Sequence, residues 1–358
     1  MSAEFTCNQE IVEVARRNLT QDVWDYLTGA AESETTLRRN RHVLDKIAFL
    51  PRVCRDVSTV DTSTTFLGYK LRIPVMLAPI GSLQAIHESG GAASCAAAAK
   101  FGTIPMISSI TLPSLEDCAK VADGPKIFQL YVRGDKEWIR DILRRVKASG
   151  YVALALTVDS ALYGIRERQL MNLYQPPSVR AQTNRHLQSA ITWELMEWIR
   201  DEWGGPFILK GIATAADTKM AIERGVDIIY VSNHGGRQLD HCLGAAESLT
   251  HVVAAAEGKA RILVDGGFLR GSDVIKAVAL GADAVLIGRL QGWALAAGGA
   301  DGLVRSLELV EREIRNTLGL LGLTSFAALN RDYICQTEAL GPCHEMSAFA
   351  HLPNGRLV

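Results

Sequence analysis

The chain has 358 residues, of which 48% are hydrophobic and 22% are charged, a composition typical of a globular protein and not of a disordered one. Lysine plus arginine total 38 and aspartate plus glutamate total 39, so the formal charge of −1 gives no electrostatic basis for binding nucleic acid or an anionic membrane surface. No apolar run approaches the roughly 20 residues of a membrane span, so we expect no membrane insertion.

Residues 1–70 are expected to form helices that precede the main domain. The first residues lack the basic and apolar regions of a secretory signal, which favours the cytoplasm. Apolar residues then recur at helical spacing, and they are Ile11, Val12, Ala15, Leu19, Val23, Trp24 and Leu27. We interpret this stripe as core packing and not as a ligand surface.

Eight short apolar runs follow, with helical stretches between them. The runs are 75–79, 104–109, 126–132, 153–159, 207–211, 228–235, 262–267 and 284–289. They are continuously apolar instead of alternating with polar residues, as expected for parallel strands covered on both faces. Helices are predicted at 135–149, 192–203, 214–224, 271–280 and 301–322. Asp273 and Gly281 fit the two ends of the predicted helix 271–280.

Eight strand–helix units predict an α/β fold, a closed (β/α)8 TIM barrel with an N-terminal helical extension. A doubly wound open sheet is the alternative, but the first strand ends in Ala78-Pro79-Ile80-Gly81 and not in Gly-x-Gly-x-x-Gly. We expect one domain over residues 1–325 and a surface tail over 326–358. The seven cysteines are scattered and never spaced as Cys-x-x-Cys, so we expect neither a disulfide framework nor a metal site.

Seven consecutive predicted strands end in polar or glycine residues. In an eight-stranded barrel, side chains at these ends face the active site, so the set predicts one site at the mouth of the barrel. The residues are Ser108, Ser109, Gln129, Tyr131, Thr157, Asp159, Lys210, Ser232, Asn233, His234, Gly235, Gly236, Arg237, Asp265, Gly266, Gly267, Gly288 and Arg289.

The last two strand ends predict a phosphate-bearing ligand. Gly266-Gly267 lets backbone N–H groups approach a phosphate, and the following helix points its N-terminus there. Arg270 and Arg289 add positive charge.

His234, Asp159 and the nearby arginines predict acid–base chemistry on an acidic substrate. An imidazole accepts a proton near neutral pH, and a carboxylate orients it and stabilises the imidazolium. Arg237 and Arg166 suit a substrate carboxylate, because a guanidinium binds it through two parallel hydrogen bonds. Lys210 is placed to stabilise negative charge on a reduced cofactor. The remaining histidines lack such context and are assigned no catalytic role.

The string Ser232-Asn233-His234-Gly235-Gly236-Arg237-Gln238-Leu239-Asp240 resembles the active-site signature of the FMN-dependent α-hydroxy-acid oxidase and dehydrogenase family. That family includes glycolate oxidase, lactate oxidase, flavocytochrome b2 and mandelate dehydrogenase. The resemblance covers about residues 8–325 and includes 25–26, 29–30, 128–131, 156–159, 164–167, 210–211 and 265–267. It implies an FMN cofactor, a small 2-hydroxy acid substrate and a homo-oligomer, specifically a tetramer.

Residue by residue, the resemblance implies that His234 is the base, supported by Asp159. It implies that Arg237 and Tyr26 bind the substrate carboxylate with help from Arg166. Tyr131 would bind the substrate hydroxyl, and Lys210 would lie beside the flavin pyrimidine. The implied isoalloxazine and ribityl contacts are Pro79, Ile80, Gly81, Ser108, Gln129, Thr157 and Ser232. The implied ribityl and phosphate contacts are Asp265, Gly266, Gly267, Arg270, Gly288 and Arg289.

The chain departs from the family pattern in four places. Leu269-Arg270 stands where the family usually has Arg-Arg, which puts one phosphate contact in question. Ile110 replaces an aromatic residue of many members, which predicts an enlarged or reshaped substrate pocket. Gly81 is typical of members that pass electrons to acceptors other than O2, whereas oxidases more often have alanine. Residues 172–191 lack the apolar insertion by which membrane-bound members attach.

We therefore expect oxidation of an (S)-2-hydroxy acid to a 2-oxo acid, with dehydrogenase-like electron transfer. Three alternatives stay open: a larger or peptide-derived hydroxy acid, a non-redox FMN barrel resembling type 2 isopentenyl diphosphate isomerase, and a flavoprotein acting as a partner or scaffold. The His-Gly-Gly-Arg string and Tyr131 disfavour the isomerase, and the retained His234 and Asp159 disfavour the scaffold. The sequence leaves open whether His234 removes the α-proton or the hydroxyl proton.

Overall fold

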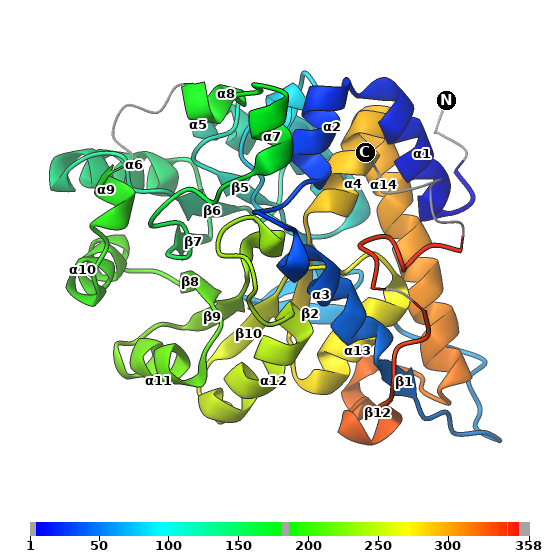
Figure 1. The fold of residues 1–358 in the computed structure, drawn as a ribbon. Helices are drawn as coiled ribbons and strands as arrows, with labels where there is room; N and C mark the ends of the chain where they lie inside the picture. The colour runs from blue at the N-terminus through cyan, green and yellow to red at the C-terminus, as the bar shows by residue number, and fades with distance from the viewer. Residues whose placement is uncertain (1–4, 181–185, 342, 351–358) are drawn as a thin grey trace.

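Eight parallel strands form the centre of the fold in a computed structural model that describes residues 5–180, 186–341 and 343–350 (Figure 1). The strands are β4 (Val75–Leu77), β5 (Met106–Ser108), β6 (Ile127–Leu130), β7 (Ala153–Thr157), β8 (Phe207–Ile212), β9 (Ile228–Val231), β10 (Arg261–Val264) and β11 (Ala284–Ile287). Their order is β4-β11-β10-β9-β8-β7-β6-β5. A bridge between Leu77 and Pro105 closes the ring, and the Leu77 N–H donates to the Ile104 carbonyl over 3.1 Å. The predicted (β/α)8 barrel is confirmed.

Helices surround the barrel in the predicted alternation. They are α4 (Gly90–Phe101), α5 (Leu115–Lys120), α6 (Lys136–Ala148), α10 (Trp193–Trp203), α11 (Ala215–Glu223), α12 (Ala245–Ala256), α13 (Gly271–Leu280) and α14 (Arg289–Leu320). Helix ends follow local chemistry, because the Asp273 carboxylate accepts from the Leu269 and Arg270 N–H groups and Gly281 ends α13 with a φ of 112°.

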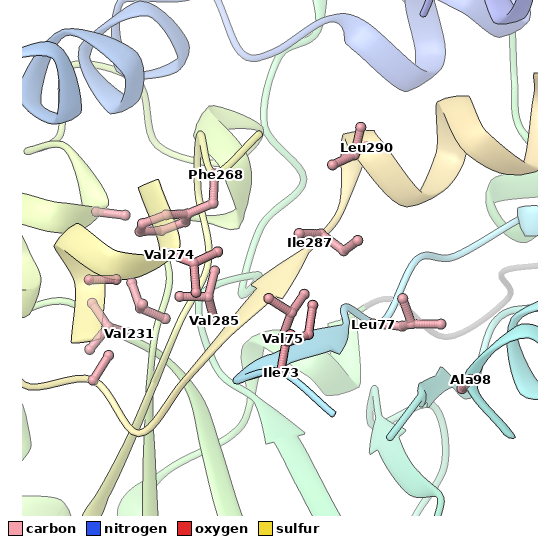
Figure 2. Close-up of a cluster of buried hydrophobic side chains, with 14 of the residues drawn as sticks. Ile73, Val75, Leu77, Ala98, Val231, Phe268, Val274, Val285, Ile287 and Leu290 are labelled. Atoms are coloured by element: carbon pink, nitrogen blue, oxygen red, sulfur yellow. The ribbon is translucent and has the colours of Figure 1, made fainter. Parts of the chain in front are cut away.

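The strands are apolar throughout because both of their faces are buried. Val75 and Leu77 of β4 and Val285 of β11 point outward toward the helices, where Val274 of α13 packs (Figure 2). Met76, which lies between Val75 and Leu77 in the chain, belongs to a separate cluster inside the barrel. This two-sided burial explains why the sequence shows continuous apolar runs.

The N-terminal extension is helical only in its first part. Helices α1 (Asn8–Asn18), α2 (Gln21–Thr28) and α3 (Thr35–Asp45) agree with the prediction. The prediction is wrong for residues 46–70, where the chain forms β1 (Ile47–Phe49) and most of a hairpin of β2 (Thr64–Phe66) and β3 (Tyr69–Leu71). The hairpin turns at Leu67-Gly68, where both residues have positive φ, and it inserts Phe66 and Leu71 into the inner cluster at the amino-terminal end of the barrel.

The long helix α14 begins directly after β11 and not at residue 301. Gly298 and Gly299 are non-helical and divide it by a kink, so the predicted helix over 301–322 is its second half. The loop between β7 and α10 carries three short helices, α7 (Glu167–Met171), α8 (Pro177–Arg180) and α9 (His186–Ser189). Residues 181–185 of this loop lie outside the described residues.

The C-terminal segment is not the surface tail that we expected. Strand β12 (Ile334–Gln336) pairs antiparallel with β1, and the side chains of Met346 and Phe349 are buried. Short 3-10 turns, η3 (Phe326–Ala328) and η4 (Arg331–Tyr333), precede β12. Residues 351–358 lie outside the described residues. In the part of the chain that the structure describes, no helix combines the length and the apolar character needed to span a membrane.

Candidate active site

A cavity of about 440 Å³ opens at the carboxyl ends of the barrel strands. Most of the predicted site residues line it, although they come from segments that are distant in the sequence. Those that line the cavity are Tyr26, Pro79, Ile80, Gly81, Tyr131, Arg166, Lys210, His234, Arg237, Asp265, Gly266, Gly267, Gly288 and Arg289. The strand ends thus meet at one site, as the barrel prediction requires.

His234 is hydrogen-bonded to Asp159, which in turn forms an ion pair with Lys210. Its Nδ1 is 2.9 Å from Asp159 Oδ1, and Asp159 Oδ2 is 3.6 Å from Lys210 Nζ. Since a carboxylate only accepts, Nδ1 carries the proton and Nε2 is left as the basic atom. The Tyr131 hydroxyl lies 3.4 Å from that Nε2.

Burial and charge act in opposite directions on this set. Burial lowers the pKa of His234, and the Asp159 carboxylate opposes this effect while Lys210 adds to it. Burial would raise the pKa of Asp159, but the interactions of its carboxylate with His234 and Lys210 hold it below its ordinary value. Burial raises the pKa of Tyr131 far above its ordinary value, so its hydroxyl stays protonated. The result is a neutral imidazole next to an ionised carboxylate.

The chain around His234 needs glycine at two positions. The turn η2 (His234–Gly236) follows β9, and its three residues all have positive φ, at 57°, 64° and 77°. A Cβ on Gly235 would lie 2.7 Å from Arg289 Nη1, and one on Gly236 would lie 2.7 Å from the Leu37 nitrogen. The Asn233 side chain accepts from the Gly236 N–H and so closes the turn.

Three guanidinium groups face the cavity and are held by uncharged partners. Arg237 donates to the Gly29 carbonyl over 2.7 Å, and its guanidinium lies 5.1 Å from the centre of the Tyr26 ring. Arg166 donates to the Arg237 carbonyl, the Tyr163 hydroxyl and Gln238 Oε1. Arg289 donates to the carbonyls of Thr28, Gly29 and Gly235.

None of these three arginines forms a salt bridge within the described part of the chain. Burial, and then the neighbouring charge of Arg237, lower the pKa of Arg166 to about 10 and that of Arg289 to about 9. A buried cluster of like charges is costly unless anions join it. The cavity is therefore suited to negatively charged ligands.

Four predicted cofactor residues lie in a buried layer below the cavity surface. Ser108 Oγ donates to Gln129 Oε1 over 2.7 Å, and Gln129 Nε2 donates to Thr157 Oγ1 over 2.8 Å. On the other side, Lys210 Nζ donates to Ser232 Oγ, which donates to Asp265 Oδ1. These side chains are already satisfied by one another, so they position the groups that line the cavity.

Arg270 is the predicted site residue that the structure places elsewhere. Its guanidinium is 2.9 Å from Glu313 Oε1 and donates to the Ala348 carbonyl. The apolar side chain of Leu269 lines the cavity instead. Arg270 lies outside the cavity because the carboxylate that pairs with it, that of Glu313, belongs to α14.

The cavity has the features that a phosphate-bearing flavin needs. Helix α14 begins after Gly288 with no side chain capping its first N–H groups, which leaves them for a phosphate. A Cβ on Gly288 would meet nothing closer than Ala78 Cβ at 4.0 Å, so this wall faces open space. Lys210 and Arg289 supply positive charge, and the residues present therefore fit FMN.

Sequence reasoning missed several residues that shape the site. Gln188 is buried, accepts from the Val132 N–H and donates to the Thr157 carbonyl. Asn40 binds Asn233 through its side-chain amide. Glu345 and Met346 line the cavity from the C-terminal segment. Only Gln238, which lies within the quoted string, carried a signal; the others are isolated residues without a pattern.

Residues 15–336 match the family model described as FMN-dependent dehydrogenase. Glycolate oxidase 5 of Oryza sativa subsp. japonica is 36% identical to this chain, over 94% of the chain and 97% of the relative. An L-lactate oxidase of Nostoc sp. is also 36% identical, over 91% and 96% of the two proteins. A crystal structure of mandelate oxidase with (S)-4-hydroxymandelic acid superposes with a TM-score of 0.87 at 34% identity, covering 94% of this chain and 100% of that chain.

The turn at His234 predicts a difference between two Gly→Ala substitutions. Gly236→Ala should cost about 1–2 kcal/mol for its positive φ and a further 1–3 kcal/mol for the contact with Leu37. Gly258→Ala is the matched control, because its φ is 72° but its Cβ would meet nothing within 4 Å. Chemical denaturation measures both losses in unfolding free energy. Equal losses would show that the contact with Leu37 relaxes freely.

Proposed function

The chain belongs to the family of FMN-dependent dehydrogenases, and we propose that it oxidises an (S)-2-hydroxy acid to the corresponding 2-oxo acid. As a member it is an FMN-dependent enzyme of the hydroxy-acid oxidase class. One observation carries the proposal: the basic Nε2 of His234 faces the same cavity as three guanidinium groups that lack a carboxylate partner. The relatives favour this reaction over a non-redox FMN barrel or a scaffold flavoprotein.

In the proposed mechanism, Arg237 and Arg166 bind the substrate carboxylate. Each guanidinium offers a planar fork of donors, and the Tyr26 ring lies against that of Arg237. The protonated Tyr131 hydroxyl, beside His234 Nε2, donates to the substrate hydroxyl. These contacts fix the α-carbon in front of the base.

His234 accepts a proton at Nε2, and Asp159 stabilises the imidazolium through Nδ1. Bound FMN supplies the acceptor for the two electrons that leave the substrate. Lys210, which pairs with Asp159 and Ser232, stabilises the negative charge that builds up beside it.

Gly81 supports the dehydrogenase-like part of the proposal. It lines the cavity, and its carbonyl accepts from the Tyr26 hydroxyl over 2.6 Å. We propose that the reduced enzyme passes its electrons to a dye or quinone faster than to O2. Stopped-flow reoxidation with each acceptor tests this part separately from substrate oxidation.

Replacement of the base should abolish turnover and spare the cofactor. In His234→Ala, the rate of anaerobic flavin bleaching by substrate should fall by about 10²–10⁴-fold, because no side chain removes the proton. The bound FMN per chain, measured by absorbance, should stay as in the parent enzyme. Bleaching at a near-normal rate would refute the assignment of His234.

Loss of the supporting carboxylate should change the pH profile in a definite direction. Asp159 raises the pKa of His234, so Asp159→Asn should lower that pKa further. The acid limb of the kcat/KM profile, where the base becomes protonated, should therefore move to lower pH, with a lower plateau. A limb that moves to higher pH would contradict the charge relation that we describe.

A second candidate substrate class, larger hydroxy acids, is favoured by the apolar half of the cavity. This half is built by the segments after β5, β6 and β7, and its lining includes Ile110, Val132 and Val179. Leu162 lies at its edge and is 80% exposed, so the pocket opens toward solvent along an apolar rim. Such a wall suits a substrate with an apolar side chain longer than that of lactate.

This candidate predicts an effect of side-chain size at position 110. Ile110→Trp should lower kcat/KM for 2-hydroxyoctanoate by at least about tenfold and leave glycolate within about threefold, since each buried CH2 contributes about 0.8 kcal/mol. Leu320→Trp, at an exposed position remote from the cavity, is the control. Equal losses for both acids would show that Ile110 does not limit the substrate side chain.

A further inference from the structure

A single peptide unit joins the N-terminal extension to the arginines of the cavity. The Gly29 carbonyl accepts from Arg237 Nη1 over 2.7 Å and from Arg289 Nη2 over 2.9 Å. The N–H of the same peptide unit belongs to Ala30, and it donates to Glu34 Oε1 over 2.9 Å. A trans peptide points its N–H and its C=O in opposite directions, so the carboxylate and the guanidinium groups lie on opposite sides of this unit. The orientation of one amide thus links Glu34 to the arginines.

Glu34 is held behind this peptide by a tight turn between α2 and α3. Its own N–H donates to the Ala31 carbonyl over 2.8 Å, and the Ala31 N–H donates to the Gly236 carbonyl of the turn after β9. Glu34 has a φ of 59°, in the left-handed region that is unfavourable for residues other than glycine and is kept where surrounding contacts require it. The side chain is buried, and its Oε2 accepts from Arg168 of α7. The carboxylate is therefore fixed in place from two sides.

The two arginines depend on the Gly29 carbonyl to different degrees. Arg289 also donates to the carbonyls of Thr28 and Gly235, so it stays anchored when the bond to Gly29 is lost. For the Arg237 guanidinium, Gly29 is the hydrogen-bond acceptor found among the described residues, and its further contact there is the face of the Tyr26 ring. A change in the direction of the Gly29 carbonyl would therefore disturb Arg237 more than Arg289.

We propose that Glu34 is a positioning residue for the substrate carboxylate: by accepting from the Ala30 N–H, it holds the Gly29 carbonyl toward Arg237 and so fixes the guanidinium that binds the substrate. The inference rests on the proposed function, in which Arg237 binds that carboxylate. Glu34 is not among the described residues that line the cavity, so it acts through Arg237. What matters is the reach of its side chain to the amide and not its charge, since a neutral amide oxygen accepts the same hydrogen bond.

Two conservative substitutions separate reach from charge. Glu34→Asp keeps the charge but removes one methylene, so the carboxylate no longer reaches the Ala30 N–H, and aspartate tolerates the left-handed backbone. Glu34→Gln keeps the reach and removes the charge, and Arg168 still has Glu345 at 3.7 Å. Anaerobic flavin bleaching is followed over a range of concentrations of glycolate or 2-hydroxyoctanoate, whichever bleaches the parent enzyme faster. These data give the half-saturating concentration and the limiting rate separately.

Glu34→Asp should impair substrate binding selectively. The half-saturating concentration should rise about tenfold or more, because Arg237 loses its fixed position, and the limiting rate should change by less than about threefold. Glu34→Gln should stay within about threefold of the parent enzyme in both quantities. The Kd of FMN, from fluorescence titration of the flavin-stripped full chain, should change by less than about threefold in either variant, because Arg289 keeps two carbonyl partners.

Glu32→Gln is the matched control, because it removes the same charge from an exposed position of the same turn. It should leave all three quantities unchanged. The proposal is overturned if Glu34→Gln is impaired as much as Glu34→Asp or more, because charge would then act in place of the hydrogen bond. Equal losses of substrate and FMN affinity in Glu34→Asp would also overturn it, since they indicate general damage to the fold.

Failure of this inference is distinguishable from failure of the proposed function. A parent enzyme whose flavin is bleached by no 2-hydroxy acid would contradict the proposed function, and with it the role of Glu34. A parent enzyme that is bleached, with Glu34→Asp unchanged in its half-saturating concentration, would contradict the role of Glu34 alone.

Discussion

The cavity is governed by an excess of buried positive charge. Arg166, Arg237 and Arg289 face one space, and their hydrogen bonds go to carbonyl, hydroxyl and amide oxygens instead of carboxylates. Dipoles of this kind hold a guanidinium in place without cancelling its charge. Because none of the three arginines forms a direct ion pair in the described part of the chain, we expect anions in the cavity to stabilise the folded protein. The proposed 2-hydroxy acid substrate and the phosphate of FMN would supply two of them.

The carbonyls that hold these arginines also connect the N-terminal extension to the barrel. Arg237 and Arg289 both donate to Gly29, which follows α2, and Arg289 also donates to Gly235 in the turn after β9. The extension is therefore part of the site and not an appendage. This explains why Tyr26, from the end of α2, stands against the barrel mouth.

The proposed base, His234, is positioned by the register of three neighbouring strands. Thr157 of β7 pairs with Lys210 of β8, and Lys210 pairs with Tyr230 of β9, so Asp159, Lys210 and His234 leave the sheet side by side. The ladder shifts between Lys210 and Ile212, at Gly211, where a Cβ would lie 2.6 Å from Asp159 Cβ. The irregularity of β8 thus lets the carboxylate approach both the lysine and the imidazole.

The sequence was informative where the residues of a single helix or strand are enough to determine its structure. The strands were predictable because Val75 and Met76 are both buried, on opposite faces. Strands β1 and β12 were missed because Ile47 pairs with Gln336, and no local pattern indicates a partner so far along the chain. Arg270 was misplaced because Glu313, which pairs with it, lies on a different helix.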